Sequence, residues 1–128
     1  MTISSMSALV AVAPGHLRDG LRAMLNTMPH VNIIEADDHD AAGALLAERR
    51  PDLVILDCDL PGGDANALVQ QAKRESPSTR CAVLVNLPAE RRAALAAGAD
   101  SAPLKGMLAS KLFVEVERLL FCNSPSTQ

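Results

Sequence analysis

Aromatic residues are nearly absent from this 128-residue chain. It has no Trp and no Tyr, and its two Phe residues are Phe113 and Phe121. Surfaces that stack bases or sugar rings are built from aromatic side chains, so this class of binding surface is excluded. Hydrophobic residues nevertheless make up 48% of the chain, and most of them are Ala, Leu and Val. The sequence therefore predicts an aliphatic core.

Cysteine is also scarce. The three cysteines, Cys58, Cys81 and Cys122, are odd in number and lack the paired spacing of a zinc site or a disulfide framework. They fall in apolar or terminal contexts. We expect reduced thiols at these positions, most of them buried.

Neither sign of charge dominates the chain. The formal net charge is −3, and the basic residues are scattered among acidic ones, which argues against a nucleic-acid surface. The apolar stretch near the N-terminus has no basic residues before it, and it is shorter than the roughly 20 residues that span a bilayer. We therefore expect no membrane contact and a cytoplasmic location.

The length and the hydrophobic pattern predict one α/β domain. We expect residues 1–122 to form it around a single core and residues 123–128 to form a polar tail. Short apolar runs alternate with segments of helical period. The predicted strands are 8–13, 31–36, 53–56, 81–85 and 101–104, and the predicted helices are 16–28, 41–51, 64–75, 88–97 and 108–121.

The run from Leu53 to Leu56 is the clearest strand. It is apolar without alternation, as expected for a central parallel strand with helices on both faces, and Asp57 follows it directly. Five strand–helix units with short connections predict a parallel sheet with right-handed crossovers and a three-layer α/β/α architecture. Ligands of such sheets bind beyond the carboxyl ends of the strands, so we expect the chemistry near Asp57.

Two segments carry a resemblance to a known family. LVILDCDLPGGDANALVQQAKRESP, and GADSAPLK before the last helix, resemble the receiver domains of response regulators, the CheY-like superfamily, and the likeness covers nearly the whole chain. HLRDGLRAML and LLAERRPDLVILD are most similar to the branch whose receivers precede helix-turn-helix output domains, the LuxR/NarL type. The resemblance implies a flavodoxin-like, doubly wound, five-stranded parallel sheet of (βα)5 order.

The resemblance also implies a phosphorylation site. Asp57 matches the aspartate that accepts a phosphoryl group from a histidine kinase, and Lys105 matches the lysine that pairs with that group. A carboxylate on a rigid strand end can attack phosphorus in line, provided that a metal and a lysine neutralise the charge on the three equatorial oxygens.

This chain departs from the family at the metal site. Receivers hold Mg²⁺ with an adjacent acidic pair after the first strand, and these positions fall on Val12 and Ala13. Neither side chain offers the oxygen ligand that a hard cation needs. Mg²⁺ is thus the one cofactor implied, with Asp57 as a weak ligand in a site that we expect to be lost.

The parts that report phosphorylation are altered as well. The relay hydroxyl at the end of the fourth strand falls on Val85, followed by the polar Asn86, and the aromatic switch residue falls on Ala102. Asp59 and Asn86 are the remaining polar candidates at the mouth of the pocket.

Two hypotheses follow. The first is a receiver-like module of two-component signalling, with Asp57 as phosphoacceptor, that contacts a histidine kinase or another signalling protein or forms a homodimer. The alternative is a phosphorylation-independent pseudo-receiver, an atypical receiver that binds a protein or a small ligand. An enzyme is disfavoured, because the sequence shows no nucleophile with an adjacent base and no dinucleotide fingerprint.

Overall fold

The structure, a computed structural model, describes residues 5–107 and 109–121. The predicted tail, residues 123–128, and Cys122 lie outside the described residues. In chain order the elements are β1 (Met6–Ala11), α1 (His16–Asn26), β2 (Val31–Ala36), α2 (His39–Arg49), β3 (Leu53–Asp57), α3 (Ala65–Glu75), β4 (Arg80–Leu84), α4 (Pro88–Ala96) and α5 (Ala109–Phe121). Their bounds differ from the predicted ones by a few residues at the ends, where helices and strands are least defined.

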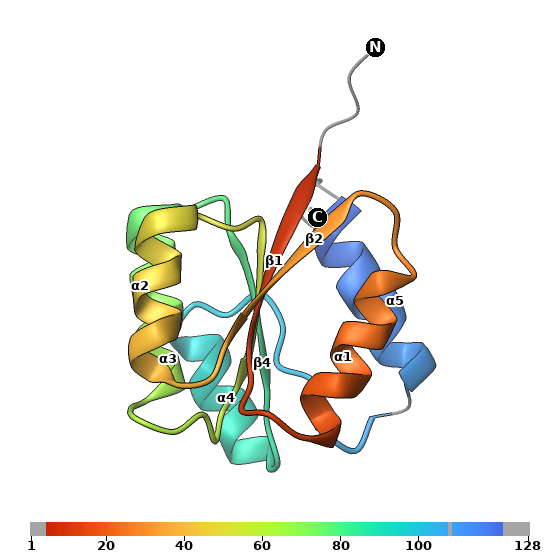
Figure 1. The fold of residues 1–128 in the computed structure, drawn as a ribbon. Coiled ribbons are helices and arrows are strands. Elements are labelled where there is room, and N and C mark those ends of the chain that lie inside the picture. The colour runs from red at the N-terminus through yellow and green to blue at the C-terminus, as the bar shows by residue number, and fades with distance from the viewer. Residues whose placement is uncertain (1–4, 108, 122–128) are drawn as a thin grey trace, which may run out of the picture.

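The strands form a parallel sheet in the order β2-β1-β3-β4. Helices α2, α3 and α4 cover one face of the sheet, and α1 and α5 cover the other (Figure 1). This is the predicted three-layer α/β/α architecture. None of the described helices has the length and the apolar character needed to cross a bilayer.

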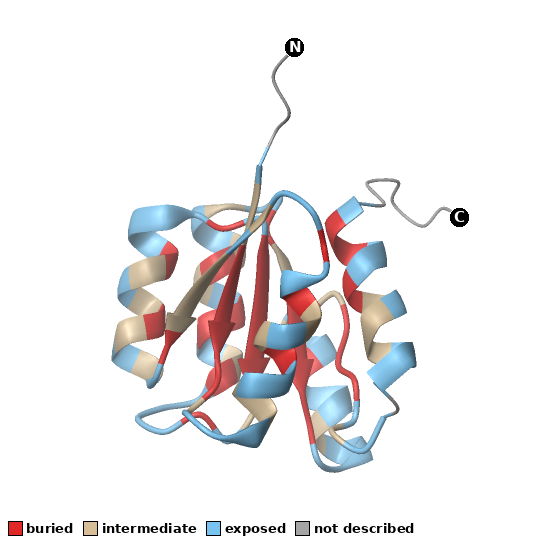
Figure 2. Ribbon diagram, turned by 45° about the vertical axis from the view of Figure 1, so that its right-hand side comes forward, coloured by how far each residue is buried: buried red, intermediate tan, exposed pale blue. Residues whose placement is uncertain are grey.

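The central strand β3 is buried on both faces (Figure 2). Its side chains alternate, so that Val54 and Leu56 enter the core beneath α2, α3 and α4, whereas Leu53 and Ile55 enter the core beneath α1 and α5. Successive residues of a strand point to opposite faces, which explains why an unbroken apolar run is required here. The strand is thus a fixed support for the residue at its end, Asp57.

The prediction of a fifth regular strand at 101–104 is wrong. Ser101 and Leu104 make only isolated parallel bridges, to Ala82 and Val85. The amides of Val83 and Val85 donate to the carbonyls of Ser101 and Pro103, each at 3.0 Å. The next bond of a parallel ladder would come from the amide of residue 103, which proline lacks. The sheet therefore has four regular strands and an edge segment that proline interrupts.

The described cysteines are free thiols, as expected. Cys81 lies in the core beneath α2, α3 and α4, and burial raises the pKa of its thiol to about 11. Cys58 is half-buried and directly follows Asp57.

Candidate functional site

Asp57 and Lys105 form an ion pair at the carboxyl edge of the sheet. Lys105 Nζ lies 2.6 Å from Asp57 Oδ1, and the two side chains are 23% and 13% exposed. The edge segment positions the lysine, because the Lys105 amide donates to the Val85 carbonyl at 2.8 Å. The segment 101–104 thus places Lys105 in the pocket although it is not a regular strand.

Asp59 and Asn86 complete this cluster. The Asp59 amide donates to Asp57 Oδ1 at 2.9 Å, which fixes the turn after β3. Asp59 Oδ2 accepts from Lys105 Nζ at 2.8 Å and from Asn86 Nδ2, also at 2.8 Å. The four polar residues selected from the sequence therefore lie within hydrogen-bonding reach of their neighbours in one network.

The loop after β3 is held against the start of α2. The His39 amide donates to the Pro61 carbonyl at 2.8 Å, and a Cβ on Gly63 would lie 2.5 Å from the His39 ring. Gly62 adopts a φ of 98°, in the region that favours glycine. Glycines at these two positions let the loop pack closely on α2 and keep the mouth of the pocket in place.

The network stabilises the charged forms of Lys105 and Asp59. Burial acts to lower the pKa of the Lys105 ammonium, but hydrogen bonds to Asp57 and Asp59 outweigh it, and the pKa rises above its ordinary value. Hydrogen bonds from Lys105 and then Asn86 lower the pKa of the Asp59 carboxyl. The Lys105 ammonium thus lies in contact with the carboxyl groups of both Asp57 and Asp59.

The titration of Asp59 tests this balance. In the folded protein the pKa of the Asp59 carboxyl should lie below the ordinary aspartate value of about 3.9. NMR of the side-chain carboxyl carbon across a pH series measures it. Because the pKa of Asp59 is lower in the folded state, its contacts stabilise the fold fully at pH values above the unfolded-state pKa. This stabilisation is lost as the pH falls through the folded-state pKa. Lys105→Met and Asn86→Leu should each move the midpoint upward, with Lys105→Met giving the larger shift. An unchanged midpoint in Lys105→Met would contradict the geometry.

Two residues at the site were missed in the sequence analysis. Glu90, in the first turn of α4, accepts hydrogen bonds from the amides of Asn86 and Leu87 at 2.8 and 3.1 Å. Cys58 Sγ lies 3.8 Å from Glu90 Oε1 and 3.5 Å from Asn86 Nδ2. Pro88 followed by a glutamate in the first turn is a helix-start signal that could have identified Glu90. Burial, and then the charge of Asp59, raise the pKa of the Cys58 thiol, so it stays protonated.

The positions that depart from the family have hydrocarbon side chains. Val12 is buried just beyond β1, with Ala13 next to it, and Val85 and Ala102 are both buried. None of these four side chains has an oxygen or nitrogen atom to offer a ligand.

The donor set at this edge does not fit Mg²⁺. Receiver domains bind this ion through an acidic cluster, and the one grouping of metal-ligand side chains among the described residues is Asp57, Cys58 and Asp59. Mg²⁺ demands near-octahedral oxygen coordination, whereas this group includes a thiol, and Lys105 already pairs with both carboxylates. The ammonium of Lys105 is thus the cation that contacts both carboxylates.

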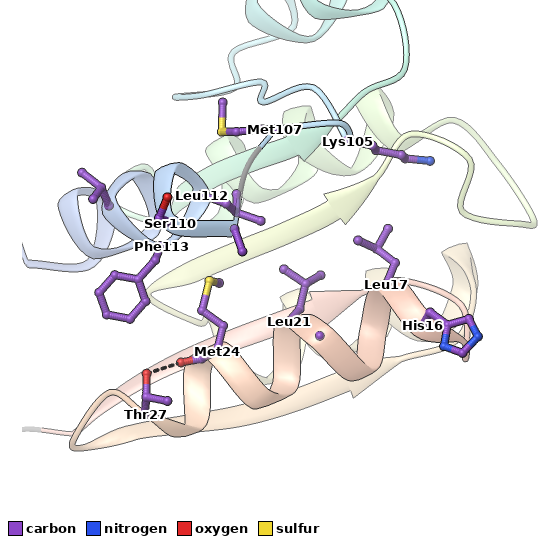
Figure 3. Close-up of a pocket in the computed structure, with 13 residues that line it drawn as sticks. His16, Leu17, Leu21, Met24, Thr27, Lys105, Met107, Ser110, Leu112 and Phe113 are labelled. Atoms are coloured by element: carbon purple, nitrogen blue, oxygen red, sulfur yellow. Dashed lines mark hydrogen bonds between the residues drawn. The ribbon is translucent and has the colours of Figure 1, made fainter.

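A groove between α1 and α5 opens beside the site. Leu17, Leu21 and Met24 of α1 point toward α5, where Leu112 and Phe113 lie, and Lys105 lies at one end (Figure 3). The facing side chains are apolar, so this groove adds surface rather than chemistry to the Asp57 pocket.

A parallel α/β sheet with an aspartate and a lysine paired at its carboxyl edge defines a class of signalling domain. The family model of the response regulator receiver domain matches residues 15–117. The chain therefore belongs to the response regulator receiver family, whose members are signalling modules of two-component systems and not enzymes.

The curated relatives are transcriptional regulators. The chain is 35% identical over 97 residues to the phosphate regulon transcriptional regulatory protein PhoB of Escherichia coli K12, and 34% identical to that of Klebsiella pneumoniae. The match covers 72% of this chain and 42% of those proteins. The chain thus spans less than half the length of the curated relatives it matches.

Solved structures of this fold are similar over nearly the whole chain. The chemotaxis response regulator CheY4 of Vibrio cholerae superposes with a TM-score of 0.80 and 19% identity, over 91% of this chain and 100% of that one. A LuxR-family two-component response regulator from Aurantimonas sp. SI85-9A1 gives 0.81 and 23%, over 91% and 86%. NtrX from Brucella abortus gives 0.81 and 27%, over 93% and 27%. The similarity to the LuxR/NarL branch in particular stays a prediction.

Proposed function

We propose that Asp57 is the phosphoacceptor of this receiver and that Lys105 pairs with the phosphoryl group. The observation that carries the proposal is the 2.6 Å contact between Lys105 Nζ and Asp57 Oδ1 at the end of a strand buried on both faces. A rigid support and a cation in contact with the nucleophilic carboxylate both favour in-line phosphoryl transfer.

The proposed step is transfer from a phosphohistidine. An oxygen of the Asp57 carboxylate attacks phosphorus, and the new O–P bond forms as the P–N bond breaks, with its electron pair going to the imidazole nitrogen. The Lys105 ammonium moves from the carboxylate to the phosphoryl oxygens and neutralises part of their charge. A single ammonium offers less neutralisation than a metal and a lysine together, so we expect slow transfer.

We expect the partners of this domain to be proteins: a histidine kinase or another signalling protein, with a homodimer as the self-associated form. Several basic side chains already pair with acidic ones, including Arg22 with Glu35 and Lys73 with Asp100. This pairing leaves little excess positive charge for a phosphate backbone and supports the expectation of no nucleic acid through this domain. The cytoplasmic location stays a prediction from the sequence.

Intact mass after incubation with acetyl phosphate tests the proposal. We expect a gain of one phosphoryl group, with the same yield in Mg²⁺ and in EDTA, because the pocket does not fit the metal. A gain that requires Mg²⁺ would support Asp57 as acceptor and contradict the conclusion that the pocket does not fit the metal. No gain under either condition would overturn the phosphoacceptor role and leave the pseudo-receiver hypothesis, whose basis is the hydrocarbon character of Val12, Ala13, Val85 and Ala102.

A further inference from the structure

Helix α4 is weakly attached to the body of the domain. Of the described residues of α4, Ala94 is the only one that is buried. Leu87, at the N-cap, is 57% exposed, and Leu95 is 39% exposed. A leucine side chain cannot accept a hydrogen bond, so the cap amides depend on Glu90. Little packing opposes a change in the position of this helix.

A continuous set of contacts joins Asp57 to that first turn. Lys105 Nζ bridges Asp57 and Asp59, and Asp59 Oδ2 also accepts from the side chain of Asn86. The backbone amide of the same Asn86 donates to Glu90 at 2.8 Å. Asn86 therefore contacts the charged pocket through its side chain and the start of α4 through its main chain.

We propose that Asp59 and Asn86 transmit the charge state of the Asp57–Lys105 pair to the first turn of α4. This link would replace the relay hydroxyl in reporting phosphorylation, since Val85, at the relay position after β4, has a buried hydrocarbon side chain. The response to phosphorylation rests on the proposed function above, whereas the response to loss of the Lys105 charge does not.

The coupling has a direct electrostatic cause. Lys105 and Asn86 donate to the same oxygen, Asp59 Oδ2, each at 2.8 Å. When the Lys105 ammonium moves to a phosphoryl group, Asp59 loses its cation and faces added negative charge. The Asp59 carboxylate then turns outward, and Asn86, which hydrogen-bonds to it, changes position. A shift of Asn86 also alters the hydrogen bonds that the backbone amides of Asn86 and Leu87 donate to Glu90.

A second route to α4 must be separated from this one. The Lys105 amide donates to the Val85 carbonyl, so a change at Lys105 could also reach Asn86 through the main chain. That route does not need the Asn86 side chain. Removing the side-chain amide while keeping a side chain of similar size therefore distinguishes the two.

The test uses amide hydrogen exchange and amide chemical shifts of the full chain. The variants are Lys105→Met, Asn86→Leu and the double variant, with Asn32→Leu, at an exposed position on β2, as matched control. We expect Lys105→Met to change exchange at Asn86 and Leu87 by roughly two- to tenfold, the value of one hydrogen bond. In the Asn86→Leu background this effect should be lost, and in the Asn32→Leu background it should persist.

Each outcome decides the inference. An equal response to Lys105→Met with and without the Asn86 side chain, or no response in either, would overturn it. Acetyl phosphate gives a second comparison: in phosphorylated protein the change at α4 should be present in the parent chain and lost in Asn86→Leu. If no phosphoryl group is gained, the proposed function fails, while the Lys105→Met comparison still decides whether the link exists.

Discussion

The Asp57→Asn variant is expected to take up no phosphoryl group from acetyl phosphate under conditions that phosphorylate the parent chain. An amide has almost no nucleophilicity toward phosphorus, whereas the carboxylate that it replaces is fully nucleophilic. The substitution keeps the size of the side chain at the end of β3, so the fold should be retained. Intact mass spectrometry of both proteins, treated side by side, measures the difference.

Asp59→Asn is the matched control for this experiment. It removes the other carboxylate that contacts Lys105, but it leaves Asp57 and its 2.6 Å contact with Lys105 Nζ in place. We expect this variant to gain the phosphoryl group. Uptake by Asp57→Asn, or loss of uptake in Asp59→Asn alone, would assign the acceptor role to a different residue.

Leu56→Ala should lower the free energy of unfolding by about 2–5 kcal/mol. Leu56 is fully buried in β3, in the core beneath α2, α3 and α4, and the truncation leaves a cavity in tightly packed surroundings. Domains of this size are stable by about 5–15 kcal/mol in total, so the loss is a large part of the whole. Urea denaturation monitored by circular dichroism gives the value.

Val114→Ala provides the comparison at the surface. Val114 lies on α5 and is 61% exposed, so its truncation should change the free energy of unfolding by less than about 0.5 kcal/mol. Similar losses in both variants would mean that the β3 core is not packed as described here.

The order of the elements could be predicted because the signal lies in local patterns. The apolar run from Leu53 to Leu56 predicted a strand covered on both faces, and the alternation of short apolar runs with segments of helical period predicted the other elements. The regular pairing of residues 101–104 could not be predicted in the same way. That pairing depends on which amide faces β4, and Pro103 removes the one that the ladder needs next.

The residues of the site also fall into a predictable group and an unpredictable one. Asp57 ends β3, Asp59 and Asn86 lie just beyond β3 and β4, and Lys105 follows the edge segment beside β4. The carboxyl ends of parallel strands meet at one edge of a sheet. Their approach was therefore predictable from topology. The contact between Cys58 and Glu90 depends on how α4 is angled over the loop after β3, and no sequence period encodes that angle.

The interruption at Pro103 also affects how this domain behaves toward other copies of itself. An open sheet edge with an unbroken row of amides and carbonyls can recruit a strand from another molecule and start aggregation. Here the segment beside β4 makes only isolated bridges and leads directly into a charged lysine. Because no regular fifth strand forms, this margin of the sheet is a short and irregular edge rather than a long template for edge-to-edge polymerisation.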